Sequence, residues 1–309
     1  MKLERSGLIA LGILLIIIIA VSGMFLYFKY IYVPPPVEKI VKEGDCVDVD
    51  YIGKFASNGT VFDTSYELVA KENGIYDENR TYEPLRIFVD TVGDKEKPDG
   101  YENYSSFMIP GFLKGLKGMR EGETKTVTIP PEEGYGVWNE TLAELMGIGS
   151  IPRESVMNST MKMNKTMFTS SFPNVTIALG TTFDIGKDQY FGFGVEGIFN
   201  ATIINVTDTN VTVKVSPKNG STFVLPVFEI NATVIVYNDT SYTLRFDTEV
   251  NHTFSVTAYF EHMHFKVVEV NETSIKLALN MEAPKVSLVD QTLVFELNVV
   301  KIYKTSQES

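Results

Sequence analysis

The most frequent chemical motif in this sequence is Asn-x-Ser/Thr, in which the asparagine amide can accept an N-linked glycan. Fifteen of the 18 asparagines stand in this motif, although Ser and Thr make up only 47 of 309 residues and chance would give roughly 3. Because attached glycans must face solvent, the motif predicts an extracytoplasmic surface. An alternative is a Thr-rich β composition that pairs Asn with Thr by accident. The candidate glycosylation sites are Asn58, Asn79, Asn103, Asn139, Asn158, Asn164, Asn174, Asn200, Asn205, Asn210, Asn219, Asn231, Asn238, Asn251 and Asn271.

Other residues that commonly do chemistry are scarce. The single cysteine, Cys46, excludes an internal disulfide framework and a Cys-rich zinc site, and its strand setting favours a small buried hydrophobe. His262 and His264 lie two apart and would face one side of a strand, but no third ligand accompanies them. We therefore predict no metal site and no cofactor. The net charge of −12 disfavours binding to nucleic acid.

Tyrosine, phenylalanine and aspartate side chains cluster in segments with the two-residue period of β-strands. Residues 45–53 alternate, so Tyr51 shares one face with two valines while aspartates take the other. Asn58-Gly59 predicts a hairpin turn into a second strand that contains Phe62 and Asp63. Asp63 taken alone is more typical of a turn or cap residue, and Phe62 of plain core.

The elements that must position these side chains form an antiparallel sheet around one short helix. Further strands are predicted over 84–89, 124–130 and 292–303, and residues 90–107 are predicted to form a loop. A short helix is expected to begin near Pro110 and to end at Gly118. The predicted fold class is therefore α+β.

Three blocks of the sequence resemble the FKBP-type peptidyl-prolyl cis-trans isomerases. They are residues 44–65, 108–136 and 292–302, and they keep the family's order. The resemblance implies an FKBP-like isomerase domain over 44–136 plus 286–304. The interval 137–285 falls where the SlyD-like branch carries its insert-in-flap chaperone domain. Within it, Ile151-Pro-Arg-Glu-Ser155 resembles the entry to that insert, and Asn280-Met-Glu-Ala-Pro284 resembles its exit.

The resemblance also implies which residues line an aromatic site for a proline. Tyr135 or the Ile109 N–H would hold the substrate carbonyl oxygen, and Asp63, fixed by Tyr51, would orient the carbonyl carbon. Leu85 stands where the family prototype has an aromatic residue, and Phe112 stands in place of a tryptophan. The implied catalytic residues are Tyr51, Asp63, Tyr135 and Phe295, and the implied substrate-binding residues are Phe62, Leu85, Met108, Ile109 and Phe112.

The N-terminus is predicted to anchor the chain in a membrane. Residues 6–28 carry no charge over 23 positions, which as a helix would span about 35 Å. Basic residues precede this run, which favours a cytoplasmic N-terminus and an extracytoplasmic remainder. We expect residues 1–33 to form the cytoplasmic tip and transmembrane helix, and residues 34–43 a proline-rich stalk. The alternative is a cleaved signal peptide.

The interval 137–285 is predicted to be a β-rich insert with a short helix over 141–146. Strands are expected at 198–204, 209–216, 221–228, 231–237, 240–246, 253–260, 264–270 and 273–279. Met157, Met161, Met163 and Met167 indicate either an adaptable apolar surface for unfolded chains or a disordered, glycosylated loop. A pattern with a period of 66 residues, beginning at Phe199 and again at Phe265, suggests two related hairpin units.

Three functions compete. The first is a membrane-tethered, extracytoplasmic prolyl isomerase whose insert binds unfolded or proline-containing clients. The second is a non-catalytic holdase chaperone that uses the FKBP-like domain only as a peptide cradle. The third is a glycosylated structural protein of the cell surface, which would explain the glycosylation motifs but not the aromatic site.

Overall fold

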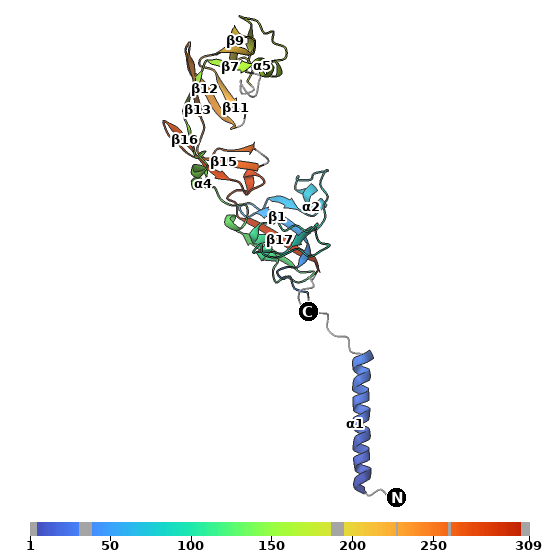
Figure 1. The fold of residues 1–309 in the computed structure, drawn as a ribbon. Helices are drawn as coiled ribbons and strands as arrows, with labels where there is room; N and C mark the ends of the chain where they lie inside the picture. The colour runs from blue at the N-terminus through green and yellow to red at the C-terminus, as the bar shows by residue number, and fades with distance from the viewer. Residues whose placement is uncertain (1–4, 31–38, 187–194, 227, 259–260, 304–309) are drawn as a thin grey trace.

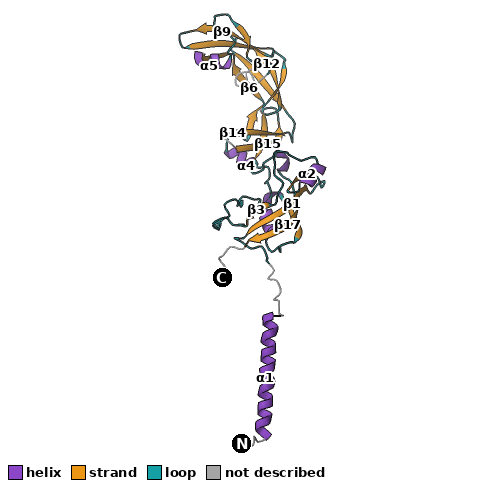
Figure 2. Cartoon of the chain, turned by 90° about the vertical axis from the view of Figure 1, so that its right-hand side faces the viewer, coloured by secondary structure: helices purple, strands orange, loops and turns teal. Residues whose placement is uncertain are grey.

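The computed structural model describes residues 5–30, 39–186, 195–226, 228–258 and 261–303. Beyond an N-terminal helix, it consists of one five-stranded sheet and three four-stranded sheets, with few helices between them (Figures 1 and 2). In Figure 1 the four-stranded sheets follow one another away from the five-stranded sheet. The predicted combination of an α+β unit with a large mostly-β region is therefore present.

The five-stranded sheet is antiparallel and is formed by the two ends of the described region beyond the first helix. Its order is β2-β1-β17-β4, and β3 pairs with part of β1. Alternate side chains of β1 and β17 are buried, as the period of two in the sequence predicts. The strands are β1 (Cys46–Phe55), β2 (Val61–Thr64), β3 (Leu85–Phe88), β4 (Thr124–Ile129) and β17 (Leu293–Tyr303).

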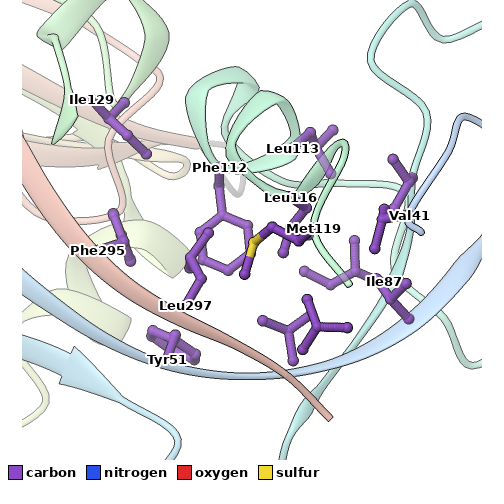
Figure 3. Close-up of a cluster of buried hydrophobic side chains, with 14 of the residues drawn as sticks. Val41, Tyr51, Ile87, Phe112, Leu113, Leu116, Met119, Ile129, Phe295 and Leu297 are labelled. Atoms are coloured by element: carbon purple, nitrogen blue, oxygen red, sulfur yellow. The ribbon is translucent and has the colours of Figure 1, made fainter. Parts of the chain in front are cut away.

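The helix α3 (Pro110–Leu116) packs on this sheet. Pro110 occupies the first turn, where a missing N–H costs nothing, and Gly118 follows the helix at φ +81°. Phe112 and Leu116 lie one turn apart, and both are buried in the cluster drawn in Figure 3. The helix predicted from Pro110 to Gly118 is confirmed.

Smaller elements complete this part of the molecule. The helix α2 (Glu67–Glu72) follows β2, and the sequence analysis did not predict it. Two 3₁₀ helices, η1 (Pro131–Glu133) and η2 (Val286–Leu288), lie after β4 and before β17. The segment 90–107 contains no helix or strand, as expected, although Ser105 forms an isolated bridge with Ile87.

The three four-stranded sheets share one plan. Each contains a hairpin, the strand that precedes the hairpin in sequence, and one strand from the short segment 150–164, which pairs with the second strand of the hairpin. We call them proximal, middle and distal in order from the five-stranded sheet (Figure 1). The proximal sheet contains β5 (Ser150–Pro152), β14 (Thr253–Ala258), β15 (Glu261–Val270) and β16 (Ser274–Asn280); the middle sheet contains β6 (Glu154–Asn158), β11 (Thr222–Leu225), β12 (Ile230–Tyr237) and β13 (Ser241–Asp247); the distal sheet contains β7 (Thr160–Asn164), β8 (Thr182–Asp184), β9 (Phe199–Val206) and β10 (Asn210–Pro217).

The segment 150–164 therefore runs outward through all three sheets, and the rest of the region returns through them in reverse order. One residue lies at each of the two points where this segment passes from one sheet to the next. Arg153, between β5 and β6, donates to the Asn271 carbonyl at 3.0 Å and to Asp247 Oδ1 at 2.8 Å, and so joins the proximal and middle sheets. Ser159, between β6 and β7, is fully buried, and its hydroxyl donates to the Asp239 carbonyl at 2.8 Å.

Two apolar cores support these sheets. The middle and distal sheets share one core, in which Phe199 of β9 contacts Phe223 of β11 with ring centroids 5.2 Å apart. The helix α5 (Lys165–Ser171) adds the fully buried Phe168 to that core. The proximal sheet packs with α4 (Glu140–Leu145), the helix predicted at 141–146, through Ala143.

The methionines of the insert correct one expectation. Neither alternative offered for this stretch, a client-binding methionine surface or a disordered loop, describes what forms there. Met157, Met161 and Met163 lie on β6 and β7 and pack against the shared core, while only Met167, on α5, is exposed. The physical reason is that these three methionines, with Ser159, alternate with polar residues and so share one face of extended chain.

The predicted repeat accounts for two of the three sheets. Phe199 begins the hairpin β9–β10, and Phe265 lies in the hairpin β15–β16. The hairpin β12–β13 lies between them in sequence and has the same neighbours in its sheet. The region thus contains three units of one strand plan, where the sequence pattern suggested two.

A helix forms where the membrane anchor is predicted, namely α1 (Arg5–Tyr30). Among the residues that the structure describes, however, no helix meets the length and apolarity needed to cross a membrane. The predicted anchor is not supported by this finding.

Cys46 is expected to be unreactive in the folded protein. Its side chain is fully buried at the start of β1, and burial raises the pKa of its thiol to about 11. Because the thiolate is the reactive form, a disulfide reagent at pH 8 should leave the native protein unmodified over minutes and should label one thiol per chain in denaturant. Rapid labelling of the native protein would contradict this burial.

Candidate active site

Three neighbouring strands bring together residues from the two ends of the sheet region. In the register of the five-stranded sheet, Gly53 of β1 lies opposite Phe295 of β17 and opposite Asp63 of β2. Tyr51 lies two residues earlier on the same face of β1. The C-terminal strand therefore returns beside the first strand, as the sequence analysis requires.

The centre of the site is a group of packed aromatic rings. Phe295 contacts Phe112 of α3 at a centroid separation of 5.3 Å, Tyr51 at 6.1 Å and Phe62 at 5.7 Å. The contacts with Phe112 and Phe62 are edge-to-face, which is a favoured aromatic geometry. Figure 3 shows Tyr51, Phe112 and Phe295 converging between α3 and the sheet. These four rings, which we call the apolar floor, are held by the sheet (Tyr51, Phe62 and Phe295) and by α3 (Phe112).

Gly53 is the residue that allows this packing. A Cβ at this position would lie 2.8 Å from Phe62 Cζ and 2.9 Å from Phe295 Cε1, closer than real Cβ contacts. The absence of a side chain thus lets two rings meet over the strand.

The remaining implied substrate-binding residues and the implied catalytic residue Tyr135 lie at the edge of the buried cluster that contains the floor. Leu85, Met108, Ile109 and Tyr135 are half-buried and pack against the buried cluster. Each therefore keeps part of its surface accessible to a bound peptide. Trp138 packs there in the same way, and the sequence analysis did not single it out.

The polar side of the site is a hydrogen-bonded chain through Asp63. The Tyr51 hydroxyl donates to Asp63 Oδ2 at 2.6 Å, as the resemblance implies. The Thr64 N–H donates to Asp63 Oδ1 at 2.9 Å. Arg80 forms an ion pair with Asp63 and donates from Nη2 to the Tyr51 oxygen at 2.9 Å. Asp63 is therefore held by three groups.

Arg80 contacts Asp63 and Tyr51, and the sequence analysis did not single it out. It follows Asp63 by 17 positions, and α2 lies between them. Its guanidinium also lies over the ring of Tyr82, with the carbon 5.3 Å from the centroid. The only local signal is a single basic residue in the polar stretch 77–83, which does not show that its side chain reaches back to β2.

Both tyrosine hydroxyls of the site are held in the protonated form. Burial, followed by the negative charge of Asp63, raises the pKa of Tyr51 well above its usual range. The same two causes raise the pKa of Tyr135. At neutral and mildly alkaline pH the two groups are therefore hydrogen-bond donors.

A pH profile tests this assignment. Since an ordinary tyrosine titrates near pH ~10 and both pKa values are raised, kcat/KM in the prolyl isomerisation that the family resemblance implies should stay within about twofold between pH 7 and 9.5. The measurement is a coupled or spectroscopic isomerisation assay, with the intrinsic thermal rate subtracted at each pH. A fall with a midpoint near pH 9 would show that one hydroxyl ionises more easily than its burial allows.

The histidines do not form a metal site in the part of the chain described. His264 is buried, with Nδ1 2.7 Å from Ser255 Oγ and Nε2 2.9 Å from the Ala283 carbonyl oxygen, so both ring nitrogens have partners. The side chain of His262 lies outside the described residues. Within those residues no three His, Cys, Asp or Glu side chains are grouped to hold a metal ion.

Comparison with known proteins shows which family part of this chain resembles. Residues 87–166 match the model of the FKBP-type peptidyl-prolyl cis-trans isomerases. A short-type peptidyl-prolyl cis-trans isomerase of Methanocaldococcus jannaschii is 45% identical over 115 residues, which cover 37% of this chain and 60% of that protein. An FK506-binding protein 2 of Podospora anserina is 29% identical over 138 residues, or 41% of this chain and 60% of its own length.

A further FK506-binding protein 2, from Aspergillus oryzae, is 36% identical over 114 residues, or 37% of this chain and 58% of that protein. The chain thus spans about three fifths of the length of these relatives. The matched segment contains α3 and Tyr135, and the structure adds the residues of β1, β2 and β17 that surround them. Residues 87–166 of this chain are therefore similar to the FKBP-type peptidyl-prolyl cis-trans isomerases.

Proposed function

We propose that this protein is a peptidyl-prolyl cis-trans isomerase that acts on extracytoplasmic protein clients. The observation that carries the proposal is the convergence of Tyr51, Asp63 and Phe295 from three separate strands onto one aromatic site, in which Tyr51 and Phe295 are buried and Asp63 is half-buried. The family match of residues 87–166 supports the same reading.

The chemistry follows from the physics of the prolyl amide. Rotation about this bond meets a barrier of ~18–20 kcal/mol, because the planar form is stabilised by resonance. The planar amide is also more dipolar than the twisted one, so an apolar floor of Phe112, Phe295 and Phe62 disfavours the ground state more. Each 1.36 kcal/mol removed from the barrier gives about tenfold in rate, and ~5–7 kcal/mol gives 10⁴–10⁵.

The polar groups would orient the rotating bond. The Tyr135 hydroxyl, protonated by the argument above, can donate to the substrate carbonyl oxygen while the chain turns. Asp63, fixed by Tyr51, Thr64 and Arg80, can face the carbonyl carbon. No nucleophile, acid–base exchange or cofactor is needed for a rotation.

A proline-limited refolding assay tests the enzyme directly. The full-length protein should accelerate the slow phase of a client whose refolding waits for a prolyl bond, and the fast phases should not change. A slow phase that is unaffected at micromolar concentrations would refute the proposal.

The three four-stranded sheets are proposed to hold clients near the site. The proximal sheet ends in β14, an edge strand whose sequence, TFSVTA, carries no charge. An extended client segment can add to such an edge by backbone hydrogen bonds. The holdase alternative differs only in lacking catalysis, so the refolding assay separates the two.

The junction of the insert allows the proposed chaperone role of the insert to be tested by deletion. The Asn139 N–H donates to the Leu279 carbonyl at 2.9 Å and the Leu279 N–H to the Asn139 carbonyl at 3.1 Å, so the two chain crossings lie side by side. A short glycine linker can therefore replace residues 140–278. We expect this variant to keep activity on a short proline peptide and to lose suppression of client aggregation. Unchanged suppression would remove the chaperone role of the insert.

The extracytoplasmic location is proposed from the glycosylation motifs. Of the fifteen candidate asparagines, thirteen are exposed and two, Asn210 and Asn271, are half-buried. The one buried asparagine, Asn280, lies outside the motif. Mass spectrometry of the native protein should show a mass above the 34.6 kDa of the polypeptide, which enzymatic deglycosylation removes. An unmodified mass would refute glycosylation.

Attachment to the membrane is a separate proposal that rests on the uncharged run of residues 6–28. The protein should stay with the membrane fraction in alkaline carbonate and should enter solution only with detergent. Release by carbonate alone would argue against an anchor.

A further inference from the structure

The insert joins the five-stranded sheet at a neck of two crossing segments. The chain leaves after Tyr135 and returns at Asn280, and the paired Asn139 and Leu279 begin the insert. Ala283, just after the return crossing, is buried in the core that contains the aromatic floor. The neck therefore lies between the candidate active site and the proximal sheet.

Asn280 ties the two crossings together. Its Nδ2 donates to the Tyr135 carbonyl at 3.0 Å and to the Val137 carbonyl at 3.3 Å. Its Oδ1 accepts from the Glu282 N–H at 3.1 Å and from the Ala283 N–H at 3.0 Å. These four bonds use the full capacity of a side-chain amide, and the residue is only 3% exposed.

The backbone next to Tyr135 has little freedom to move. Gly136 has φ +75°, and a Cβ there would lie 2.6 Å from Glu282 Oε2 and 3.0 Å from Asn280 Nδ2. The Gly136 carbonyl accepts from the Asp290 N–H at 3.0 Å. The return crossing thus packs directly against the turn that carries Tyr135.

We propose that Asn280 is a positioning residue for the isomerase reaction. By holding the Tyr135 carbonyl and the turn after it, Asn280 sets where the Tyr135 hydroxyl meets the substrate oxygen. The insert is thereby fastened to a catalytic group, and not only to the surface of the domain. This inference rests on the proposed isomerase function.

Two observations distinguish positioning from simple packing. The two donor bonds of Asn280 cross from the return segment to the segment that carries Tyr135, whereas the two acceptor bonds stay within residues 280–283. Loss of the donors alone should therefore loosen Tyr135 and leave the return turn formed. An aspartate keeps the acceptors and removes the donors when ionised.

A double-mutant cycle tests the inference in the full-length protein. We expect Asn280→Ala to lower kcat for a short proline peptide about tenfold, with KM changed less than twofold. In a Tyr135→Phe background, which lacks the hydroxyl, the same substitution should change kcat less than twofold. Equal losses in both backgrounds, or no loss in either, would overturn the inference.

A second variant covers the case in which the alanine variant does not fold. Asn280→Asp should be impaired at pH 8 and should recover at least threefold, relative to wild type at the same pH, on lowering to pH 5, because desolvation at this buried position favours the protonated carboxyl, which can again donate to the Tyr135 carbonyl. Absence of recovery would overturn the inference. Asn73→Asp, at an exposed position on the C-terminal end of α2, is the matched control and should behave as wild type at both pH values.

The activity of the wild-type protein in the same assay distinguishes failure of the proposed isomerase function from failure of the proposed role of Asn280. An inactive wild type overturns the proposed function and this inference together. An active wild type combined with equal losses in the cycle overturns only the role of Asn280.

Discussion

Replacing Phe295 by alanine should lower the free energy of unfolding by about 3–5 kcal/mol, the range for removing a buried phenylalanine. The ring is 3% exposed and contacts Phe112, Tyr51 and Phe62. It also lies over Gly53 at the centre of the five-stranded sheet, where neighbouring strands leave the backbone little room to collapse into the cavity. Urea unfolding followed by circular dichroism measures the change.

A matched control lies on the same strand. Val300 of β17 is 42% exposed, so Val300→Ala should change the free energy of unfolding by no more than about 0.5 kcal/mol. The difference between the two variants reports the packing of the aromatic floor and not the β-propensity of β17. If Phe295→Ala cost less than about 1 kcal/mol, the ring would not be packed as described.

Much of this fold could be predicted because its strands are buried on one face. In β1, β17 and the three hairpins, apolar residues recur at every second position, and that period follows from the alternation of side chains across a strand. The eight strands predicted between residues 198 and 279 therefore all appear, within a few residues at each end.

The pairing of the strands could not be predicted from this alternation. Alternation shows which face of a strand is buried but does not show which strand lies beside it. The short strands β5, β6 and β7 pair with β16, β13 and β10, which lie far along the chain. Their pattern is also weak, because methionine is a flexible side chain with no marked β preference. The third unit was missed for a different reason: Ala232 stands midway between Phe199 and Phe265, where the repeat pattern would need a phenylalanine.

The residues of the candidate site also differ in whether the sequence could place them. Tyr51, Asp63 and Phe295 could be placed together because the family resemblance supplies the pairing of the first and last strands. Arg80 could not, since it lies in an irregular segment after α2 and no period relates it to Asp63. The sequence showed Asn280 only as the first residue of the exit motif, because its proposed role depends on bonds to backbone carbonyls of a distant turn.

The largest effect on activity is expected at Asp63. Asp63→Ala should lower kcat/KM for a short proline peptide by ten- to a hundredfold, or about 1.4–2.7 kcal/mol in the barrier. The substitution removes the acceptor of the Tyr51 hydroxyl at 2.6 Å and leaves the Arg80 guanidinium without its acidic partner beside the floor. Asp63→Asn keeps an acceptor for Tyr51 but loses the charge, so its loss should be intermediate.

The control for this series is Asp94→Ala, since the Asp94 side chain is 59% exposed in the loop after β3 and takes no part in the site. It should retain wild-type kcat/KM and stability.

Arg80→Met tests the group that holds Asp63, because it removes the guanidinium while leaving the carboxylate and its bonds from Tyr51 and Thr64. Its loss should be smaller than that of Asp63→Ala, and in an Asp63→Ala background it should add little, since the two side chains act as one unit. Independent, additive losses would show that Arg80 contacts the substrate itself.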